Sequence, residues 1–346
     1  MNPSVLPLKL RCALAICALA ALQSASAQNA TTTPVGYITI NVNGGTPAAP
    51  KVTLVAPSLV GAVQWQGATA NTGVTPSQFT VIGTPWSANQ FNGANGTHYV
   101  EIASGANSGA WSYVTATTGN SVTTQDDLSS LAVGGDTIAI RKCVTLADFF
   151  GANNEAGLLA GDELSLADEV LVYDGLTPQP YFFYDDPSDI DDGWYDADGV
   201  LANTAAIGPN QPVLIKRKAG GLTFKFVGHV KKGPTFIPVE TGTNIIPIVR
   251  AAGVELNLAS LYTGNTTTGV KPGDELALAD ELLVYNSSSI SSYYYYDDPA
   301  DVDDGWYDAD GILSNTITLQ EGTSIVLKRK TPGNAFNWIV PGPPGI

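Results

Sequence analysis

Short runs of alternating hydrophobic and polar residues dominate the chain after about residue 30. In residues 34–45, PVGYITINVNGG, Ile38, Ile40 and Val42 alternate with Tyr, Thr and Asn, and a Gly-Gly pair follows. A period of two is typical of a half-buried β-strand, and glycine pairs mark turns. Further short runs closed by Gly, Asn or Pro are PSQFTVIGTPW, HYVEIASG, GAWSYVTATTGNSVTT and GGDTIAIRK. Regularly spaced strands of this kind predict a small barrel or sandwich in the front part of the chain.

A long internal repeat occupies the rest of the sequence. Residues 161–218 align without a gap onto 273–330, and 32 of the 58 aligned positions are identical. Each copy contains four segments typical of strands, which in the first copy are EVLVYD, PYFFYD, GWYDAD and PVLIKRK. Only TLADFFG and LNLASLY resemble short helical turns. Two copies are fewer than a stacked solenoid needs, so two self-contained modules or one pseudo-symmetric pair are predicted.

The predicted fold class is therefore all-β, with a small barrel or sandwich front domain followed by two tandem β-rich repeat modules with short helical turns. The predicted domains are a signal peptide at residues 1–27, the N-terminal β-strand and small barrel or sandwich at 28–120, repeat module 1 at 121–230 and repeat module 2 at 231–346.

The first 27 residues have the three parts of a secretory signal peptide. Lys9 and Arg11 supply positive charge, an apolar run follows, and residues 25–27, Ala-Ser-Ala, form a small-residue cleavage site. The apolar run is about half the ~20 residues that span a bilayer. We expect secretion, a mature chain that starts at Gln28, and no membrane span within it.

Removal of the signal peptide changes the cysteine count and the charge. Cys143 is then the one remaining cysteine, so no intramolecular disulfide forms, and a buried hydrophobic role is predicted for it. The signal peptide contains two basic residues and no acidic ones. The mature chain therefore has 14 lysines and arginines and 32 acidic residues. Nucleic acids and anionic lipids are bound through basic residues, so neither is an expected partner.

An acidic and aromatic cassette occurs once in each repeat, as DDPSDIDDGWYDADG at 185–199 and DDPADVDDGWYDADG at 297–311. Flanking aromatic runs and the internal Pro and Gly predict a β-hairpin whose aspartates are solvated loop residues. Because crowded carboxylates repel one another, calcium is the alternative interpretation. No EF-hand spacing is present. The candidate calcium ligands are Asp185, Asp186, Asp189, Asp191, Asp192, Asp297, Asp298, Asp301, Asp303 and Asp304.

A second alternative for the cassette is carbohydrate binding. In it, Trp194, Tyr195, Trp306 and Tyr307 would form a platform that stacks against sugar rings. A glycosidase would need one carboxyl with a raised pKa opposite an ionised one. Aspartates in a hydrated loop do not supply that difference.

Other catalytic signatures are missing from the sequence. His98 and His229 are its only histidines, and neither lies in a metal-ligand spacing. There is no G-x-S-x-G, P-loop or dinucleotide fingerprint. The repeated basic cluster KRK, at 216–218 and 328–330, is predicted to form internal ion pairs with nearby aspartates of its own module, in preference to binding anions. These absences favour a non-enzymatic protein over an enzyme, and a carbohydrate-active enzyme is kept as the alternative.

The segments PVGYITINV, PWSANQF, YVEIASGANSGAW and ADEVLVYD…YFFYDD…GWYDADG…LIKRK, taken in order, resemble an uncharacterised family of secreted bacterial proteins. Its members begin with a PVGY strand after the signal peptide and end in modules with a Tyr-rich strand, a Gly-Trp hairpin and a basic strand. The resemblance implies secretion and a β-rich extracellular or envelope-associated role. It implies no activity.

Two classes of function follow from the sequence. The first is a secreted, non-enzymatic structural or adhesive protein of the bacterial cell surface or extracellular matrix, such as a filament or surface-layer subunit. Its partners would be copies of itself or other surface proteins, met through the strand Gly36–Val42. The alternative is an extracellular carbohydrate-binding protein or carbohydrate-active enzyme, with glycans bound at the aromatic hairpins.

Overall fold

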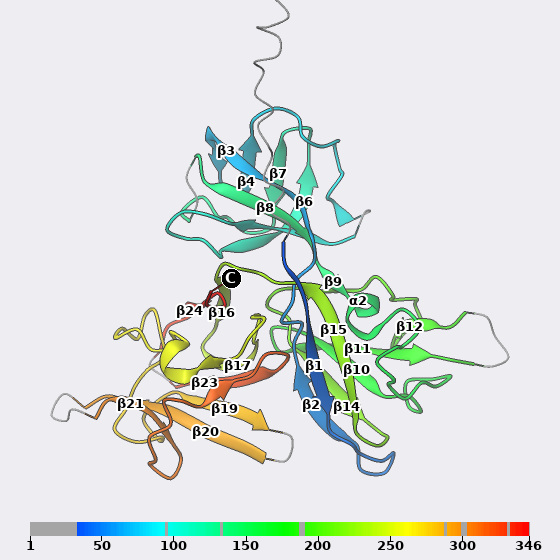
Figure 1. Ribbon diagram of the computed structural model, residues 1–346, viewed down its shortest axis with the longest axis vertical. Coiled ribbons are helices and arrows are strands. Elements are labelled where there is room, and N and C mark those ends of the chain that lie inside the picture. The colour runs from blue at the N-terminus through cyan, green and yellow to red at the C-terminus, as the bar shows by residue number, and fades with distance from the viewer. Residues whose placement is uncertain are drawn as a thin grey trace, which may run out of the picture. The chain divides into compact units, whose positions relative to one another are not determined.

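The computed structural model confirms the all-β prediction, since strands make up 46% of the described residues and helices 3% (Figure 1). It describes residues 33–93, 96–131, 134–186, 191–286, 289–298, 303–330 and 333–345. The predicted signal peptide lies outside these residues. By its internal contacts the chain divides into Met1–Thr32 and Thr33–Ile346, and only the second unit is described below. None of its described helices has the length and hydrophobicity required to cross a membrane.

Six strands close into a barrel in the order β3-β4-β7-β6-β5-β8. These strands are β3 (Val63–Thr75), β4 (Gln78–Val81), β5 (His98–Ile102), β6 (Trp111–Thr117), β7 (Ser121–Thr124) and β8 (Thr137–Lys142). Alternate residues such as Val100, Val114 and Ile140 point inward and form one hydrophobic core. Cys143, directly after β8, is buried and unpaired, as predicted, and burial raises the pKa of its thiol to about 12.

The first repeat forms a five-stranded sheet in the order β12-β11-β10-β14-β2, a two-stranded ribbon β1-β15 and a short pair β13-β9. We call these elements, with helix α2, repeat 1. They are β1 (Val35–Val42), β2 (Lys51–Val55), β9 (Val144–Thr145), α2 (Leu146–Phe150), β10 (Glu169–Asp174), β11 (Thr177–Tyr184), β12 (Gly193–Asp196), β13 (Ala206–Ile207), β14 (Val213–Arg217) and β15 (Leu222–His229).

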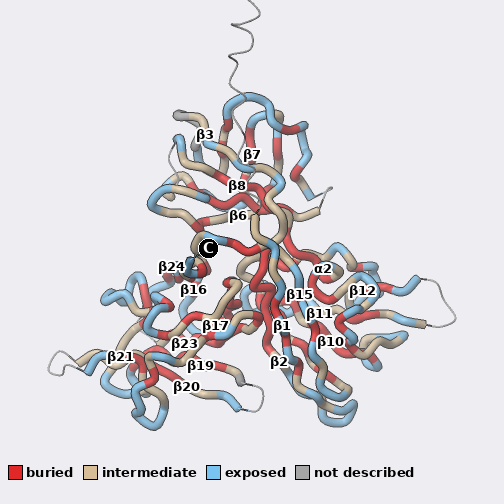
Figure 2. Tube along the Cα trace, in the orientation of Figure 1, coloured by how far each residue is buried: buried red, intermediate tan, exposed pale blue. Residues whose placement is uncertain are grey.

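The second repeat, called repeat 2, has the same arrangement: a sheet β17-β23-β19-β20-β21, a ribbon β16-β24 and a pair β18-β22. Its elements are β16 (Thr235–Val239), β17 (Gly242–Pro247), β18 (Val254–Glu255), η2 (Leu256–Leu258), β19 (Glu281–Asn286), β20 (Ser289–Tyr296), β21 (Gly305–Asp308), β22 (Thr318–Leu319), β23 (Ser324–Arg329) and β24 (Phe336–Val340). Each repeat has its own hydrophobic core (Figure 2).

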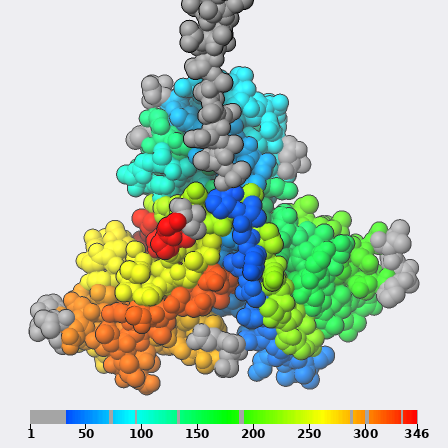
Figure 3. Space-filling view, in the orientation of Figure 1, coloured from blue at the N-terminus to red at the C-terminus, as the bar shows by residue number. Residues whose placement is uncertain are grey.

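The first two strands belong to repeat 1 by their pairing. Val52 of β2 pairs with Lys216 of β14, and Thr243 of β17 pairs with Lys328, the equivalent lysine of β23. Strand β1 likewise pairs with β15 as β16 pairs with β24, and Figure 3 shows β1 in blue directly beside β15 in lime. This organisation differs from the single front domain expected over residues 28–120. The barrel is an insertion between β2 and β9 of repeat 1.

Strand β2 also joins the two repeats. The chain that follows it carries Ser58, whose hydroxyl donates to the Ile248 carbonyl at 2.5 Å and accepts from the Gly322 N–H at 2.6 Å. Ser324 donates to the carbonyl of Val55 at 2.9 Å. Buried side chains from both repeats pack together at this seam, namely Leu54, Leu283 and Val326.

A buried ion pair holds the centre of each repeat. Asp168 pairs with Arg217 and also accepts the backbone N–H groups of Leu159 (2.7 Å) and Lys218 (2.6 Å). One carboxylate thereby ties together three segments that the hydrophobic pattern alone would not align. The Asp168 side chain is fully buried, so its negative charge is stabilised by these partners and not by water.

Repeat 2 has the same cluster. Asp280 lies 3.1 Å from Arg329 and accepts from the backbone N–H groups of Lys271 and Lys330. Outside the core, Lys216 pairs with Glu169 and Lys328 with Glu281, at 3.1 and 3.2 Å. The prediction that each KRK cluster pairs with acids of its own module is confirmed.

We expect Asp168→Asn or Asp280→Asn to lower the free energy of unfolding by about 3–5 kcal/mol, because each leaves a buried arginine without its counter-charge. Asp162→Asn and Asp274→Asn, at exposed positions in the same two loops, are the matched controls and should change it by less than about 0.5 kcal/mol. Urea titration followed by tryptophan fluorescence measures both. Equal midpoints for the buried and exposed variants would contradict the role given to this cluster.

Candidate functional site

Both cassettes form the predicted hairpins. In repeat 1, β11 pairs with β12 so that Phe183 lies opposite Trp194, and in repeat 2 Tyr295 lies opposite Trp306. Because side chains alternate across a strand, the tryptophan of each Gly-Trp-Tyr segment faces the core and the following tyrosine faces outward. The four residues proposed as a sugar platform are therefore divided between two faces of the sheet.

The two tryptophans are core residues. Trp194 is 0% and Trp306 2% exposed. The indole N–H of Trp194 donates to the Gly151 carbonyl at 2.9 Å, and its ring packs at 5.4 Å from Phe183. A ring buried in this way has no open face for a sugar, so this part of the carbohydrate hypothesis is corrected.

The outward tyrosines form matched aromatic groups in the two repeats. Tyr195 lies 5.3 Å from Tyr184 and 6.4 Å from Phe182, measured between ring centroids. The hydroxyl of Tyr195 donates to the Asp191 carbonyl at 2.9 Å, which fixes the start of β12. In repeat 2, Tyr307, Tyr296 and Tyr294 repeat this geometry, and the Tyr307 hydroxyl donates to Asp303.

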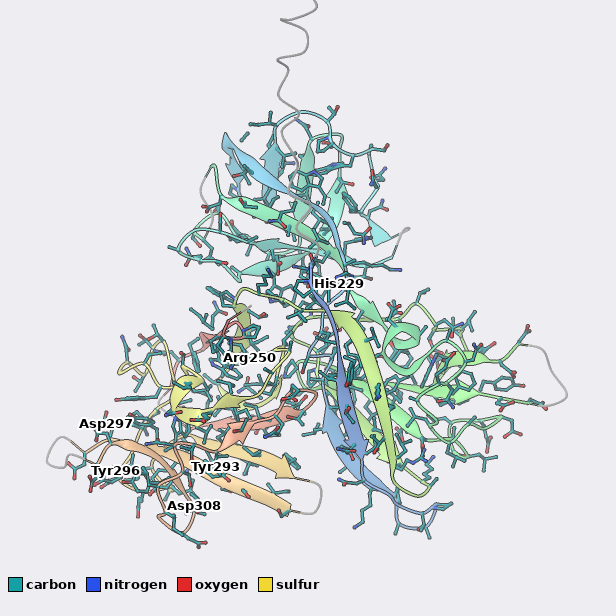
Figure 4. All side chains as sticks on the ribbon, viewed as in Figure 1. His229, Arg250, Tyr293, Tyr296, Asp297 and Asp308 are labelled. Atoms are coloured by element: carbon teal, nitrogen blue, oxygen red, sulfur yellow. The ribbon has the colours of Figure 1, made fainter. Side chains whose placement is uncertain are left out.

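The carboxylates proposed as calcium ligands lie around these hairpins. Asp189 and Asp301 fall outside the described residues. Asp185, Asp191, Asp192, Asp303 and Asp304 are exposed, whereas Asp186, Asp297 and Asp298 are half-buried. Figure 4 shows Asp297 beside Tyr296 near the loop end of β20. Within the described parts of the chain, no three acidic, histidine or cysteine side chains are grouped as metal ligands. Calcium binding stays a prediction.

The aspartate that follows Gly-Trp-Tyr in each cassette has a structural role. The side chain of Asp196 accepts the backbone N–H groups of Asp198 and Val200 at 3.0 and 2.9 Å. Asp308 makes the equivalent bonds to Asp310 and Ile312. These aspartates cap their own turn, as the hairpin interpretation predicts for Asp residues.

Repeat 2 differs from repeat 1 next to its hairpin. Tyr262 replaces the equivalent Phe150, stacks on Tyr295 at 3.8 Å and donates a hydrogen bond to Asp297. Burial and this hydrogen bond raise the pKa of Tyr262. A small pocket of 160 Å³ lies beside the pair, with Asp304 at its wall. The candidate ligand Asp297 is therefore already engaged by a phenol.

A larger cleft of 640 Å³ was not indicated by the sequence. Residues of three parts line it: strand β6 and the segment that follows β7 in the barrel, the end of β10 and the loop after β13 in repeat 1, and the β16-β24 ribbon of repeat 2. The barrel provides Trp111, Tyr113, Gln125 and Asp126, repeat 1 provides Asp174, Asn210 and Gln211, and repeat 2 provides Phe236 and Asn337. The volume is within the usual range of about 300–1,000 Å³ for ligand pockets.

The aromatic wall of this cleft is held in place from both sides. Trp111 packs edge to face against Tyr113 at 5.2 Å and against Tyr99 at 5.9 Å. Its indole N–H donates to the Phe236 carbonyl at 2.8 Å, which joins the barrel to repeat 2. Trp111 thus belongs both to the cleft wall and to the contact between these parts.

A buried charge cluster lies on the same barrel face. Glu101, the cross-strand neighbour of Trp111, is 2.8 Å from both Arg141 and Lys231, and all three side chains are buried. Arg141 also donates to the Gly61 carbonyl at 3.2 Å. Burial raises the pKa of Glu101, but Lys231 and Arg141 outweigh this effect and lower the pKa below its ordinary value.

Comparison with known proteins identifies no relative. No protein-family model matches the chain, and neither a curated protein nor a solved structure matches it. The resemblance to secreted PVGY-strand proteins therefore stays a prediction.

Sequence reasoning found the hairpins and missed the cleft. One signal for it was present, because Trp111 and Tyr113 are two residues apart and so share a face of one strand. The other lining residues, such as Asp174, Asn210 and Asn337, lie far along the chain, and no local sequence pattern places them beside Trp111 and Tyr113.

The Glu101 cluster predicts a pH dependence. Since the folded-state pKa of Glu101 lies below the unfolded value of 4.5, its stabilisation is complete above that pH and is lost as the pH falls through the folded pKa. Glu101→Gln should lower the free energy of unfolding at pH 7 by about 3–5 kcal/mol. It should also reduce the loss of stability between pH 5 and pH 3.

Urea midpoints measured at several pH values for the native protein and Glu101→Gln test this expectation. Glu240→Gln, at an exposed position, is the control. A pH profile of Glu101→Gln that runs parallel to that of the native protein would show that Glu101 carries none of the dependence.

Proposed function

We propose that this protein is a secreted, non-enzymatic adhesive or structural protein of the bacterial cell surface or extracellular matrix, of the kind that forms filaments or surface layers. The observation that carries the proposal is an exposed apolar surface that occurs twice, once in each repeat. The secretory character of residues 1–27 supports the location.

The duplicated surface consists of large hydrophobic side chains at equivalent positions. They are Leu166 (56% exposed), Val200 (59%) and Leu201 (57%) in repeat 1, and Leu278 (50%), Ile312 (62%) and Leu313 (55%) in repeat 2. Val200 and Ile312 belong to the turns that directly follow the outward tyrosines Tyr195 and Tyr307. We call this the hairpin surface.

Duplication is what connects the hairpin surface with adhesion. Val200 and Leu201, like Ile312 and Leu313, are consecutive exposed apolar residues, and neighbouring exposed apolar groups are typical of interaction sites. Two equivalent sites on one compact unit allow a second contact to form at a high effective concentration after the first, which strengthens attachment well beyond either contact alone. The surrounding aspartates keep the free protein soluble.

Strand β1, which the sequence predicts as a contact with other copies, is partly occupied within the fold. One edge of β1 is already paired with β15, and Ile38, Ile40 and Val42 lie in the core of repeat 1. Its outer face exposes Val35 and Tyr37. Self-association through this strand would use that face or the opposite edge, so a deletion of β1, which removes core residues, is unsuitable as a test.

The quadruple variant Leu166→Ser, Val200→Ser, Leu278→Ser, Ile312→Ser should be retained on producer cells at least about tenfold less than the native protein, because both contacts of a bivalent attachment are removed. Variants changed in one repeat only should be intermediate. Immunolabelling in electron micrographs and quantification of the protein released into the medium measure retention.

The matched control is Val52→Ser with Ile82→Ser, which changes exposed hydrophobic residues outside the hairpin surface. All variants should melt at temperatures close to that of the native protein. Retention of the quadruple variant at the native level, or loss of retention in the control, would contradict the proposal.

Calcium binding at the hairpin loops is a second proposal, favoured by exposed neighbouring acids at the same place in both copies. Asp191, Asp192, Asp303 and Asp304 make no salt bridge with other described residues. Calcium at a hundredfold excess over its dissociation constant should stabilise the fold by about 2.7 kcal/mol per site. Melting in millimolar calcium against EDTA measures this effect, and Asp191→Asn with Asp303→Asn should reduce it. An unchanged melting temperature would exclude calcium.

A further inference from the structure

We propose that the 640 Å³ cleft between the barrel and the two repeats is a binding site for a neutral oligosaccharide. This inference is independent of the hairpin surface, because none of the residues that form that surface lines the cleft. It rests on the cleft's size, on the mixture of aromatic and amide side chains in its walls, and on their charge.

The cleft is a built feature of the fold. Its barrel wall is fixed by the hydrogen bond from the Trp111 indole to Phe236 and by the buried contacts of Glu101 with Lys231 and Arg141. The Ser112 hydroxyl donates to the Asp126 carboxylate at 2.8 Å, which holds the chain after β7 against β6. Fixed walls spare a ligand the cost of ordering the site.

Two aromatic side chains give the cleft an apolar wall. Trp111 and Tyr113 come from one face of β6, and both are partly exposed. Aromatic rings of this kind combine a large apolar surface with a polar edge. A pyranose ring is complementary to them, since its C–H groups form apolar faces and its hydroxyls project from the rim.

The hydroxyls of such a ligand would meet neutral donors and acceptors. The side-chain oxygen of Gln211 accepts a hydrogen bond from the Gly208 N–H at 2.7 Å. The amide hydrogens of Gln211 remain as possible donors to a ligand. The side-chain oxygen of Asn210 is a buried acceptor with no hydrogen-bond partner among the described residues. Gln125 of the barrel and Asn337 of repeat 2 are exposed lining residues and can each act as donor and acceptor.

Tyr113 adds a neutral phenol to this set. Burial raises the pKa of Tyr113, with Asp174 and Asp126 adding to the effect, so its hydroxyl stays protonated. The hydroxyl reaches the backbone at Gly208, where a Cβ atom would lie only 1.8 Å from the Tyr113 oxygen. Glycine at this position therefore gives the phenol its place in the wall.

The negative charge of the cleft lining favours neutral ligands over anionic ones. Among the described residues that form the walls, Asp126 and Asp174 are the charged side chains, and there is no lysine, arginine or histidine. Phosphates, sulfates and uronic acids would meet two carboxylates without a counter-charge. A neutral sugar avoids this repulsion, and carboxylates accept hydrogen bonds from its hydroxyls.

The test uses the mature chain, residues 28–346, with a panel of neutral trisaccharides built from glucose, xylose, mannose, galactose and N-acetylglucosamine. Trigalacturonic acid serves as the anionic comparison. Isothermal titration calorimetry and ligand-observed NMR measure binding. We expect at least one neutral member to bind and the anionic trimer not to bind.

Gln125→Ala and Asn337→Ala should each weaken that binding by roughly three- to tenfold, because each removes one hydrogen-bonding side chain from the lining of the cleft. Both residues are exposed, so the variants should melt like the native protein. The controls Gln179→Ala and Asn334→Ala change exposed amides outside the cleft and should bind as the native protein does. Tyr113→Phe tests the phenol hydroxyl separately.

Three results would overturn the assignment. One is that no neutral sugar in the panel binds. Another is that a sugar binds with the same affinity to Gln125→Ala and Asn337→Ala, which would place it elsewhere on the protein. The last is that a lysine-rich peptide binds at the cleft in place of sugars, since the two carboxylates would then be selecting a cation. Cell retention through the hairpin surface is measured separately, so either proposal can fail without the other.

Discussion

Repeat 1 is complete only because β1 and β2 pair with β15 and β14, which come much later in the chain. Closing so long a segment costs conformational entropy, although the cost grows slowly with length. Burial of Ile38, Ile40 and Val42 offsets it, at about 1.5–3 kcal/mol for each fully buried side chain. The whole barrel can be inserted between β2 and β9 because the strands on either side of the insertion are anchored in one module. The seam at Ser58 and the walls of the cleft depend on that arrangement.

Several of the basic residues are buried and paired inside the protein. Arg141, Arg217, Arg329 and Lys231 are all buried, and each faces a buried carboxylate. The scarce cations of an acidic chain are thus used to join segments, and the excess of acids is left at the surface and in the hairpin loops. An acidic surface repels nucleic acids and anionic membranes, which is why the sequence predicts neither as a partner. The lining of the cleft, with two carboxylates and no basic side chain, follows the same distribution.

Local patterns in the sequence predicted what depends on neighbouring residues, including the all-β class, the hairpins and the pairing of each KRK cluster within its module. They did not predict partners that are far apart. The strand 34–45 has a clear period of two, but nothing in that pattern names β15 as its partner. The inward and outward positions of Trp194 and Tyr195 follow from strand alternation, although only packing against Phe150 and Phe183 determines which ring is buried. The cleft joins residues from three parts of the chain, so no single segment shows it.

Duplication explains why the two repeats can share one architecture and differ in chemistry. The buried Asp–Arg pair, the inward tryptophan and the capped turn are identical in both copies, because each copy needs them to fold. The side chains of Leu166, Val200 and Leu201 are exposed instead of packed in the core, yet repeat 2 has Leu278, Ile312 and Leu313 in the same places. Large apolar side chains that both copies expose, at a cost in solvation, support the proposal of a contact that is used twice. An adhesive protein that holds one surface through paired hairpins and a sugar through a separate cleft would be able to bridge the two.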